Sequence, residues 1–291
     1  MSQLKHLNDA LAYIEEHLDG TLDTGEVARI AACSAYQLKR MFPYLAGITL
    51  SEYVRRRAMT RAAQDLLATD EKVIDIALRY GYESPTAFSK AFRRVHGMSP
   101  SDVRQPGAKV TLHPRLIFTL SVKGEEPMDY RIIEQSAFRV VGIPSANGKW
   151  DLEDAGAKAA EYWEELGADV HKVVNLMDGS EPAGLLGVQF CKDGDFDCYM
   201  ACVATNQPCP NEMEERVVAA ATYAVFECEG AMPDAMNDLW HRILTEWLPS
   251  SGYEWESKTD VERYLTPNMI SPDSRSEVWL PIPGYKVIEY L

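Results

Sequence analysis

Residues 34–49 and 84–99 carry one pattern twice, fifty positions apart. The first copy reads SAYQLKRMFPYLAGIT and the second reads SPTAFSKAFRRVHGMS, with matched serine, phenylalanine and glycine positions. A short helical stretch that contains alanine precedes each copy, at residues 27–31 and 76–79. The pattern predicts helix, turn and helix in tandem. A single chain can use this arrangement to place two helices in successive major grooves of DNA.

Local chemistry favours helices at these positions. Ser34 and Gln37 have capping-box spacing, and Ser84 precedes a proline whose missing amide is harmless in a first helical turn. Thr49 and Glu52 open a longer helix, expected over residues 50–68. At 1.5 Å per residue this helix spans ~27 Å. That length suits a spacer between two helices that lie roughly 34 Å apart, one turn of DNA.

Each second helix is expected to have an apolar face in the core and a polar face outside. The apolar positions are Leu38, Met41, Phe42 and Leu45 in the first copy, and Ala87, Phe88, Ala91, Phe92 and Val95 in the second. The outward positions, predicted to contact DNA, are Tyr36, Gln37, Lys39 and Arg40, and then Pro85, Thr86, Ser89, Lys90, Arg93 and Arg94. Arginine and lysine donate to guanine edges or phosphates. Scattered basic residues are also typical of a solvated face, and the duplication is what favours DNA. The run at residues 55–57 either touches phosphate or is solvated.

Residues 3–104 resemble the DNA-binding domain of AraC-type transcription regulators. The motifs that carry the resemblance are Asp75-Ile76-Ala77, Gly81-Tyr82, Ser84, Phe88, Phe92-Arg93, Gly97 and Ser99-Pro100. The resemblance implies double-stranded DNA as the partner, with base-reading positions at Tyr36, Lys39 and Arg40, and at Pro85, Thr86 and Lys90. Because a proline side chain makes no hydrogen bond, the second helix is expected to read fewer bases.

The charge of the chain is divided unevenly along its length. Residues 1–107 hold 14 basic and 13 acidic residues, whereas the remainder holds 15 basic and 31 acidic residues, within a total of −15. An acidic second half is repelled by phosphate and attracts cations. After residues 100–107 the helical pattern gives way to alternating apolar residues. Together with the division of charge, this predicts three segments: a DNA-binding domain over 1–107, a connector with strand over 108–127, and a second domain over 128–291.

Several function classes find no support in the sequence. No apolar run is long enough to span a bilayer and no secretory signal begins the chain, which predicts a cytoplasmic protein without a membrane partner. The six histidines lack motif spacing, and we expect no catalytic site, metal or cofactor. Cys198 and Cys202 have a spacing that can hold a metal, but no histidine lies nearby, and packing on one strand face is the favoured reading.

The second half predicts an α+β domain built from two pseudo-repeated ββαββ-like units with a central ligand cleft, behind an all-α tandem helix-turn-helix domain. Strands are expected over 130–134, 138–143, 185–191, 198–204, 222–228, 260–265 and 277–282, with helices over 152–166 and 233–248. A cleft between two repeats is a common place for a small ligand.

Acids and aromatic residues alternate on the last two expected strands. Strand alternation places Glu277 with Trp279 on one face, and Glu262 with Tyr264 on one face. A carboxylate beside aromatic rings suits an organic cation, because ring faces attract positive charge and the acid neutralises it. On pattern alone, a solvated sheet face with the aromatic residues as ordinary packing is slightly favoured.

Residues 128–291 resemble the GyrI-like effector-binding domain found in multidrug-sensing and Rob-like regulators. The motifs that carry the resemblance are Asp129–Ile133, Phe138–Gly142, Trp240, Val261–Tyr264 and Glu277–Ile282. The resemblance implies a ligand anchored by Glu277, with Glu262 second, and an aromatic wall drawn from Trp279, Tyr264, Trp163, Tyr162 and Trp150. Trp163 and Trp240 also fit the helix-to-sheet core, and for Trp240 the core is the preferred interpretation.

The sequence therefore predicts a transcription regulator that senses a small cationic or amphipathic molecule. Ligand binding is expected to change domain orientation or the freedom of the connector over 100–127. DNA affinity or contact with RNA polymerase would then change. Two rival hypotheses remain: a GyrI-like small-molecule hydrolase with Glu277 or Glu262 as base, and a drug-sequestering protein with accessory DNA binding.

Overall fold

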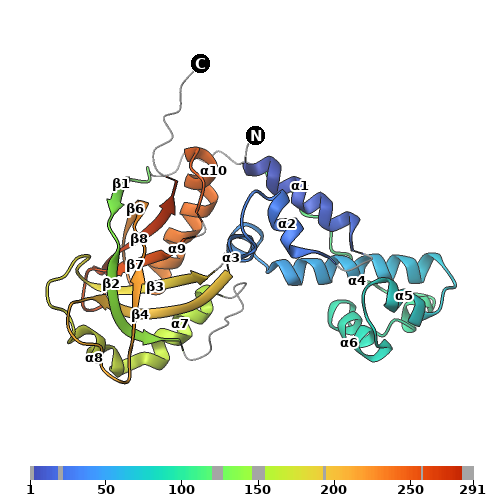
Figure 1. The fold of residues 1–291 in the computed structure, drawn as a ribbon. Coiled ribbons are helices and arrows are strands. Elements are labelled where there is room, and N and C mark those ends of the chain that lie inside the picture. The colour runs from blue at the N-terminus through green and yellow to red at the C-terminus, as the bar shows by residue number, and fades with distance from the viewer. Residues whose placement is uncertain are drawn as a thin grey trace, which may run out of the picture. The chain divides into compact units, whose positions relative to one another are not determined.

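The computed structural model describes residues 3–18, 22–119, 127–145, 155–192, 195–256 and 258–283 (Figure 1). The chain divides into two compact units, Met1–Ser121 and Val122–Leu291. None of the described helices is both long enough and apolar enough to cross a bilayer.

The first unit is helical throughout its secondary structure. Its elements are α1 (Gln3–Glu16), α2 (Thr24–Ile30), α3 (Ala35–Ala46), α4 (Leu50–Ala68), α5 (Val73–Arg79), α6 (Pro85–His96) and a 3₁₀ turn at Asp102–Arg104. Helices α2 and α3 form one helix-turn-helix motif, and α5 and α6 form the second. The bounds of α4 match the spacer helix predicted from the sequence.

The repeated serines and glycines are the ends of α3 and α6. Ser34 accepts a hydrogen bond from the Gln37 amide and completes a capping box, while Ser84 accepts from the Ala87 amide. Gly47 and Gly97 close the same helices with φ of 68° and 75°, a left-handed conformation that favours glycine. The repeat seen in the sequence therefore encodes helix start and helix stop at the same places twice.

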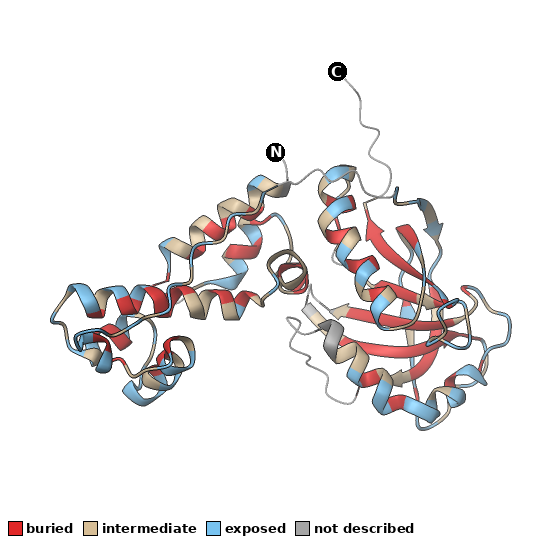
Figure 2. Ribbon diagram, turned by 180° about the vertical axis from the view of Figure 1, so that it is seen from behind, coloured by how far each residue is buried: buried red, intermediate tan, exposed pale blue. Residues whose placement is uncertain are grey.

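Of the nine apolar positions predicted for the core in α3 and α6, five are buried. Leu38, Met41, Phe42, Phe88 and Phe92 are buried. Figure 2 colours the ribbon by burial and shows buried segments within the helices of the first unit. Leu45 is only half-buried, as are Ala91 and Val95. Ala87, predicted to be core, is exposed, because it lies in the first turn of α6 beside other exposed residues.

The connector differs from the prediction. Residues 108–119 form no strand in the described structure. Their main chain is instead bonded by side chains of α1 and α4. The Asn8 side chain donates to the Phe118 carbonyl and accepts from the Phe118 amide, both at 2.9 Å. Thr60 and Tyr53 accept from the amides of His113 and Leu116 at 3.2 and 3.3 Å. The segment predicted as a strand therefore lies along α1 and α4 and is bonded by their side chains.

The second unit is built on one antiparallel eight-stranded sheet with the order β1-β6-β8-β7-β3-β4-β2-β5. The strands are β1 (Tyr130–Gln135), β2 (Phe138–Pro144), β3 (Leu185–Lys192), β4 (Asp195–Ala204), β5 (Glu214–Val218), β6 (Ala221–Glu229), β7 (Asp260–Tyr264) and β8 (Arg275–Ile282). In this order β6-β8-β7 mirrors β2-β4-β3 about the β3/β7 pair, which is the predicted pseudo-repeat. The edge strand β5 was not predicted.

Helices connect the strands in each half of the sheet. They are α7 (Ala155–Leu166), α8 (Val170–Val174) and α9 (Asp234–Arg242), with a 3₁₀ turn at Gly167–Asp169. The helix predicted over 233–248 is α9 followed by a π-helical stretch, Ile243–Trp247, and by α10 (Leu248–Ser251). The start of the helix predicted over 152–166 lies outside the described residues.

The two faces of the sheet have different roles. Residues paired directly across strands share a face. One face carries Val188, Met200, Val261 and Trp279 in a continuous apolar core. The other face carries Gly187, Tyr199 and Glu262 near the centre of the sheet, and this face receives side chains from α7 and α9.

Candidate functional site

Helix α6 exposes a basic face. Pro85, Thr86, Lys90, Arg93 and Arg94 are exposed, and Ser89 is half-buried. Pro85 occupies the first position of the helix, where an amide hydrogen would have no partner within the helix. Thr86 follows it in the first turn. The outward placement predicted for α6 is therefore seen in the structure, and its DNA-contacting role stays a prediction.

Helix α3 differs from the prediction. Tyr36, Gln37 and Arg40 are buried and do not face outward, while Lys39 is half-buried. The Gln37 side chain accepts from the Ser34 amide at 2.8 Å, which closes the helix cap. Arg40 Nη1 donates to the Tyr36 hydroxyl one turn away at 3.1 Å. The prediction that all four side chains face solvent is wrong for these three, because their polar groups are engaged within the fold.

The three arginines at residues 55–57 form ion pairs within the first unit. Arg56 pairs with Glu52 at 2.6 Å, and Arg55 pairs with the same carboxylate. Arg57 donates to both carboxylate oxygens of Glu15, at 2.7 and 2.6 Å, and to the His113 carbonyl. Arg57 therefore ties α4 to α1 and to the connector.

A buried carboxylate lies at the centre of the second unit. Glu262 of β7 is 8% exposed and accepts three hydrogen bonds. Tyr199 and Tyr264 hydroxyls donate to Oε2 at 2.8 and 3.0 Å, and Trp240 Nε1 donates to Oε1 at 2.9 Å. All three donors are neutral. Among the described residues, no lysine, arginine or histidine forms an ion pair with Glu262.

The tyrosines around Glu262 are fixed as hydrogen-bond donors. Burial raises the pKa of Tyr199 and Tyr264 well above the usual value, and the nearby charge of Glu262 raises both further. The phenols therefore stay protonated at neutral pH and donate to the carboxylate. The Tyr199 hydroxyl also accepts from Trp163 Nε1 at 3.0 Å, and the Trp163 ring meets Tyr264 edge-on at 5.2 Å between centroids.

The structure separates the two acids that the resemblance placed together. Glu277 pairs with Arg263 across the β7/β8 ladder, so it lies on the face opposite Glu262. Arg131 donates to it at 2.6 Å, Arg263 at 3.4 Å, and Trp279 Nε1 at 2.7 Å. Burial raises the pKa of Glu277, and these partners outweigh burial and lower it. Glu277 is thus already neutralised, and Trp279 belongs to the core behind the sheet.

The other predicted aromatic residues have mixed outcomes. Trp163 and Tyr264 contact the Glu262 cluster directly. Tyr162 lies one step away: its ring meets Tyr199 edge-on at 5.5 Å between centroids, and its hydroxyl bonds the Ile143 carbonyl. Trp150 lies outside the described residues.

Sequence reasoning missed two members of the cluster. Tyr199 was only part of a predicted strand, and its face is set by the register with β3, which no local pattern reveals. Trp240 was predicted to be core, and it is 2% exposed. Its indole N–H also donates a hydrogen bond to Glu262. A buried tryptophan on a helix facing a buried acid was the available signal.

Cys198 and Cys202 are free thiols that pack in the core, which is the interpretation favoured from the sequence. Cys198 and Cys202 are buried in the apolar core of the sheet. Burial raises the pKa of Cys198 to about 11, and that of Cys202 well above its usual value. No group of three potential metal ligands occurs within the described ranges.

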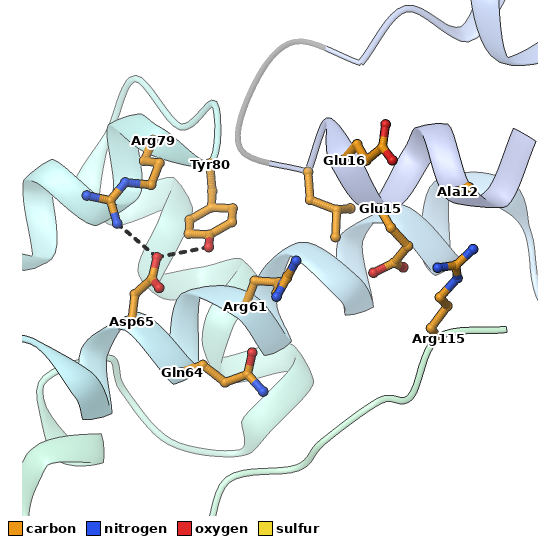
Figure 3. A pocket seen from close by; sticks show the side chains of 10 residues that line it. Ala12, Glu15, Glu16, Arg61, Gln64, Asp65, Arg79, Tyr80 and Arg115 are labelled. Atoms are coloured by element: carbon orange, nitrogen blue, oxygen red, sulfur yellow. Dashed lines mark hydrogen bonds and ion pairs between the residues drawn. The ribbon is translucent and has the colours of Figure 1, made fainter.

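A cavity of about 610 Å³ lies in the first unit among α1, α4, α5 and the connector (Figure 3). Asp65 accepts from Arg79 and from the Tyr80 hydroxyl, both at 2.9 Å. Arg61, Arg115 and Glu15 also line the cavity. The lining holds three acidic and three basic side chains, and this balance gives the cavity little preference for a cation or an anion.

Comparisons with known proteins assign both units. Residues 27–106 match the family model described as a helix-turn-helix domain. Residues 131–282, more than half of the chain, match the model described as an integron-associated effector binding protein. The fold and these matches define a helix-turn-helix regulator that carries an effector-binding domain.

Two curated relatives and one solved structure show the extent of the similarity. The regulatory protein SoxS of Escherichia coli K12 is 39% identical over 36% of this chain and 97% of its own length. The transcriptional activator AarP of Providencia stuartii is 37% identical over 33% of this chain and 70% of its own. The structure of SAV2435 bound to tetraphenylphosphonium covers 54% of this chain and 95% of its own, at 21% identity and a TM-score of 0.47.

The chain belongs to the AraC-type regulators through its first unit and to the integron-associated effector-binding family through its second. It is a ligand-responsive transcription regulator. Its homologues are regulators of transcription, and its partners are DNA and a small-molecule effector.

Proposed function

We propose that the effector is an organic cation and that Glu262 is its anchor. The observation that carries this proposal is a buried carboxylate with three neutral donors and no ion-pair partner in the described part of the chain. Burying a carboxylate without a countercharge is unfavourable by several kcal/mol. Hydrogen bonds offset part of this cost, and a bound cation would supply the missing charge.

The surroundings of Glu262 favour a lipophilic cation over a small hydrated one. Trp163, Tyr199, Tyr264 and Trp240 bring aromatic rings to the carboxylate. Ring faces attract a cation in a desolvated site by about 2 kcal/mol or more. The acidic balance of the chain, −15 overall, adds a long-range attraction for cations.

We infer that the Glu262 site binds its ligand without converting it. Both oxygens of Glu262 accept hydrogen bonds, and the neighbouring phenols have pKa values far above neutrality. The three hydrogen bonds fill three of the about four lone-pair positions of the carboxylate, which leaves Glu262 little capacity to take a proton from water. Incubation with a stoichiometric excess of protein, followed by mass spectrometry, should return the ligand unchanged. A hydrolysed product would favour the hydrolase hypothesis, and tight binding without any effect on DNA would favour sequestration.

We propose that α6 reads DNA through Thr86 and Lys90, with Arg93 and Arg94 on the phosphates, and that Lys39 supports reading by α3. Pro85 adds backbone contact only, since its side chain makes no hydrogen bond. The resemblance implies base reading by Tyr36, Lys39 and Arg40. Tyr36 and Arg40 are buried, so this role requires both side chains to become exposed on DNA.

Replacing Lys90 by alanine should weaken binding to the selected DNA site by about tenfold more than binding to random DNA, since a base contact is worth ~1–3 kcal/mol. Fluorescence anisotropy at several salt concentrations measures both affinities. A phosphate contact would instead lower both equally and reduce the salt slope by about one. Lys5→Ala on α1, whose side chain pairs with Asp9, is the matched control. Unchanged binding of both DNAs by the Lys90 variant would contradict the assignment.

We propose that the connector transmits ligand occupancy to the DNA-reading helices. Residues 113–118 are bonded to α1 and α4, and the Phe118 ring meets Phe42 of α3 edge-on at 6.0 Å between centroids. A change at the far end of this segment would therefore reach a core residue of α3. The response passes either to DNA affinity or to contact with RNA polymerase.

Asn8→Ala removes both hydrogen bonds to Phe118, each worth about 1 kcal/mol. We expect faster amide exchange at residues 116–118, unchanged cation affinity, and a reduced effect of the cation on DNA affinity. Exchange mass spectrometry and DNA titrations with and without tetraphenylphosphonium measure these quantities, with Gln64→Ala on the exposed side of α4 as control. An unaltered ligand effect in the Asn8 variant would remove the connector from the coupling.

A further inference from the structure

Gly187 occupies a position that no other residue can take without disturbing the Glu262 cluster. It lies on β3, directly opposite Glu262 on β7 and Ala201 on β4. A Cβ atom at this position would lie 2.0 Å from the Tyr199 hydroxyl oxygen, 2.9 Å from Cζ of that ring, and 3.2 Å from Glu262 Oε2. Real Cβ atoms essentially never approach other atoms within 3.0 Å. The missing side chain is therefore filled by the hydroxyl that binds the carboxylate.

Backbone conformation does not explain the glycine. The glycines with positive φ, such as Gly184 at 121°, do not include Gly187. An ordinary residue could adopt the strand geometry at position 187, so only the space above it excludes a side chain. Gly142 is a different case, because its Cβ would meet the Ala201 carbonyl at 2.0 Å, which is backbone. Gly142 serves strand packing, whereas Gly187 makes room for one functional group.

Tyr199 cannot yield that space at low cost. Its side chain is 2% exposed, and its ring is held edge-on by Tyr162 at 5.5 Å and by Trp163 at 6.4 Å between centroids. Its hydroxyl donates to Glu262 at 2.8 Å and accepts from Trp163 at 3.0 Å. A shift of the hydroxyl away from position 187 breaks both hydrogen bonds.

We propose that Gly187 is a positioning residue of the effector site. Its missing side chain allows the Tyr199 hydroxyl to join Trp163 of α7 to Glu262 of β7, and this chain of hydrogen bonds fixes the direction of the carboxylate. The proposal rests on Glu262 as the cation anchor. It adds that cation affinity depends on a residue that touches no ligand, and that α7 is coupled to the anchor through one hydroxyl.

The test is a double-mutant cycle on Gly187→Ala and Tyr199→Phe, with tetraphenylphosphonium affinity measured by calorimetry. We expect Gly187→Ala to weaken binding about tenfold, which is ~1.4 kcal/mol. Tyr199→Phe should weaken it to a similar degree. The double variant should bind within about threefold of Tyr199→Phe, because the clashing hydroxyl is gone. Full affinity in Gly187→Ala, or a complete second tenfold loss in the double variant, would overturn the proposal.

A second readout needs no ligand. The indole N–H resonance of Trp163, assigned with Trp163→Phe, should move in both single variants because the nitrogen loses its acceptor. If this resonance moves while Glu262→Gln keeps full cation affinity, the anchor is wrong and the positioning role stands. An unmoved resonance in Gly187→Ala removes the positioning role whatever the anchor is.

Folding supplies the remaining control. If Gly187→Ala alone does not fold, the double variant decides, since Tyr199→Phe removes the atom that lies nearest to the added methyl group. Recovery of a cooperative thermal transition in the double variant supports the proposal. Failure of the double variant to fold while Tyr199→Phe folds contradicts it, because the clash would then not be with the hydroxyl.

Discussion

Glu262→Gln is expected to weaken binding of tetraphenylphosphonium by about 100-fold, while the affinity of the ligand-free protein for DNA stays unchanged. Removing one partner of a buried charge pair costs about 2–5 kcal/mol, and each 1.4 kcal/mol is about tenfold in affinity. Glutamine keeps the size of the side chain and one carbonyl acceptor for the surrounding donors, so the loss reports on charge. Calorimetry with the full chain measures the effect.

Glu277→Gln is the matched control for this experiment. Glu277 is also buried, at 3% exposed against 8% for Glu262, and it also accepts a hydrogen bond from an indole. Arg131 and Arg263 already neutralise it on the other face of the sheet. We expect its substitution to leave cation affinity within about threefold and to lower stability instead, since removing one partner of a buried pair is destabilising. Tetraphenylborate, an anion of the same shape, should not bind the unaltered protein. Equal losses in the two variants would contradict the assignment of the site to Glu262.

Arg57→Met is expected to lower the free energy of unfolding of the first unit by about 3 kcal/mol. Both members of the Arg57–Glu15 pair are about nine-tenths buried. Methionine preserves apolar packing but leaves Glu15 as a buried charge and releases the His113 carbonyl. Adding Glu15→Gln should recover much of the loss, because the unpaired charge is then removed. Urea unfolding of the single and double variants measures this; a loss below about 0.5 kcal/mol in Arg57→Met, as for ordinary surface substitutions, would contradict it.

The same pair predicts a dependence of stability on pH. Burial raises the pKa of Glu15, but hydrogen bonds from Arg57 and Tyr53 outweigh it, so the pKa lies below its ordinary value of 4.5. A carboxyl group whose pKa is lower in the folded than in the unfolded state stabilises the fold fully at pH values above its unfolded-state pKa. Its contribution is lost as the pH falls through the folded pKa. Stability of the first unit should therefore fall below about pH 4.5, and less steeply in Glu15→Gln.

The first unit was predictable because its signals are local. Helix caps, a first-turn proline and closing glycines act within a few residues, and Ser34, Ser84, Gly47 and Gly97 appear in the structure with those roles. The burial of Tyr36, Gln37 and Arg40 was missed because helical periodicity assigns polar side chains to the solvent-facing side of a helix. Periodicity does not reveal a hydrogen bond between a tyrosine and an arginine one turn apart, such as the bond from Arg40 to Tyr36.

The connector and the ligand site depend on long-range pairing, which is why the sequence was less informative there. Residues 108–119 alternate like a strand, yet Asn8, Thr60 and Tyr53 satisfy their main chain in place of a neighbouring strand. Alternation placed Glu262 and Glu277 correctly within their own strands. Only the β7/β8 register shows that they lie on opposite faces, and only the β3/β4 register brings Tyr199 to Glu262.

The measurement that tests the account most directly is the DNA affinity of the full chain, with and without saturating tetraphenylphosphonium, for the unaltered protein and for Glu262→Gln. The DNA sequence that the protein prefers is first selected from a fragment library. We predict that one bipartite sequence is selected and that adding the cation changes the affinity of the protein for it at least fivefold. This change should be absent in Glu262→Gln, and tetraphenylborate should not produce it. An identical affinity with and without a cation that calorimetry shows to be bound would contradict coupling through DNA affinity. Loss of the cation response in Glu277→Gln but not in Glu262→Gln would contradict the site itself.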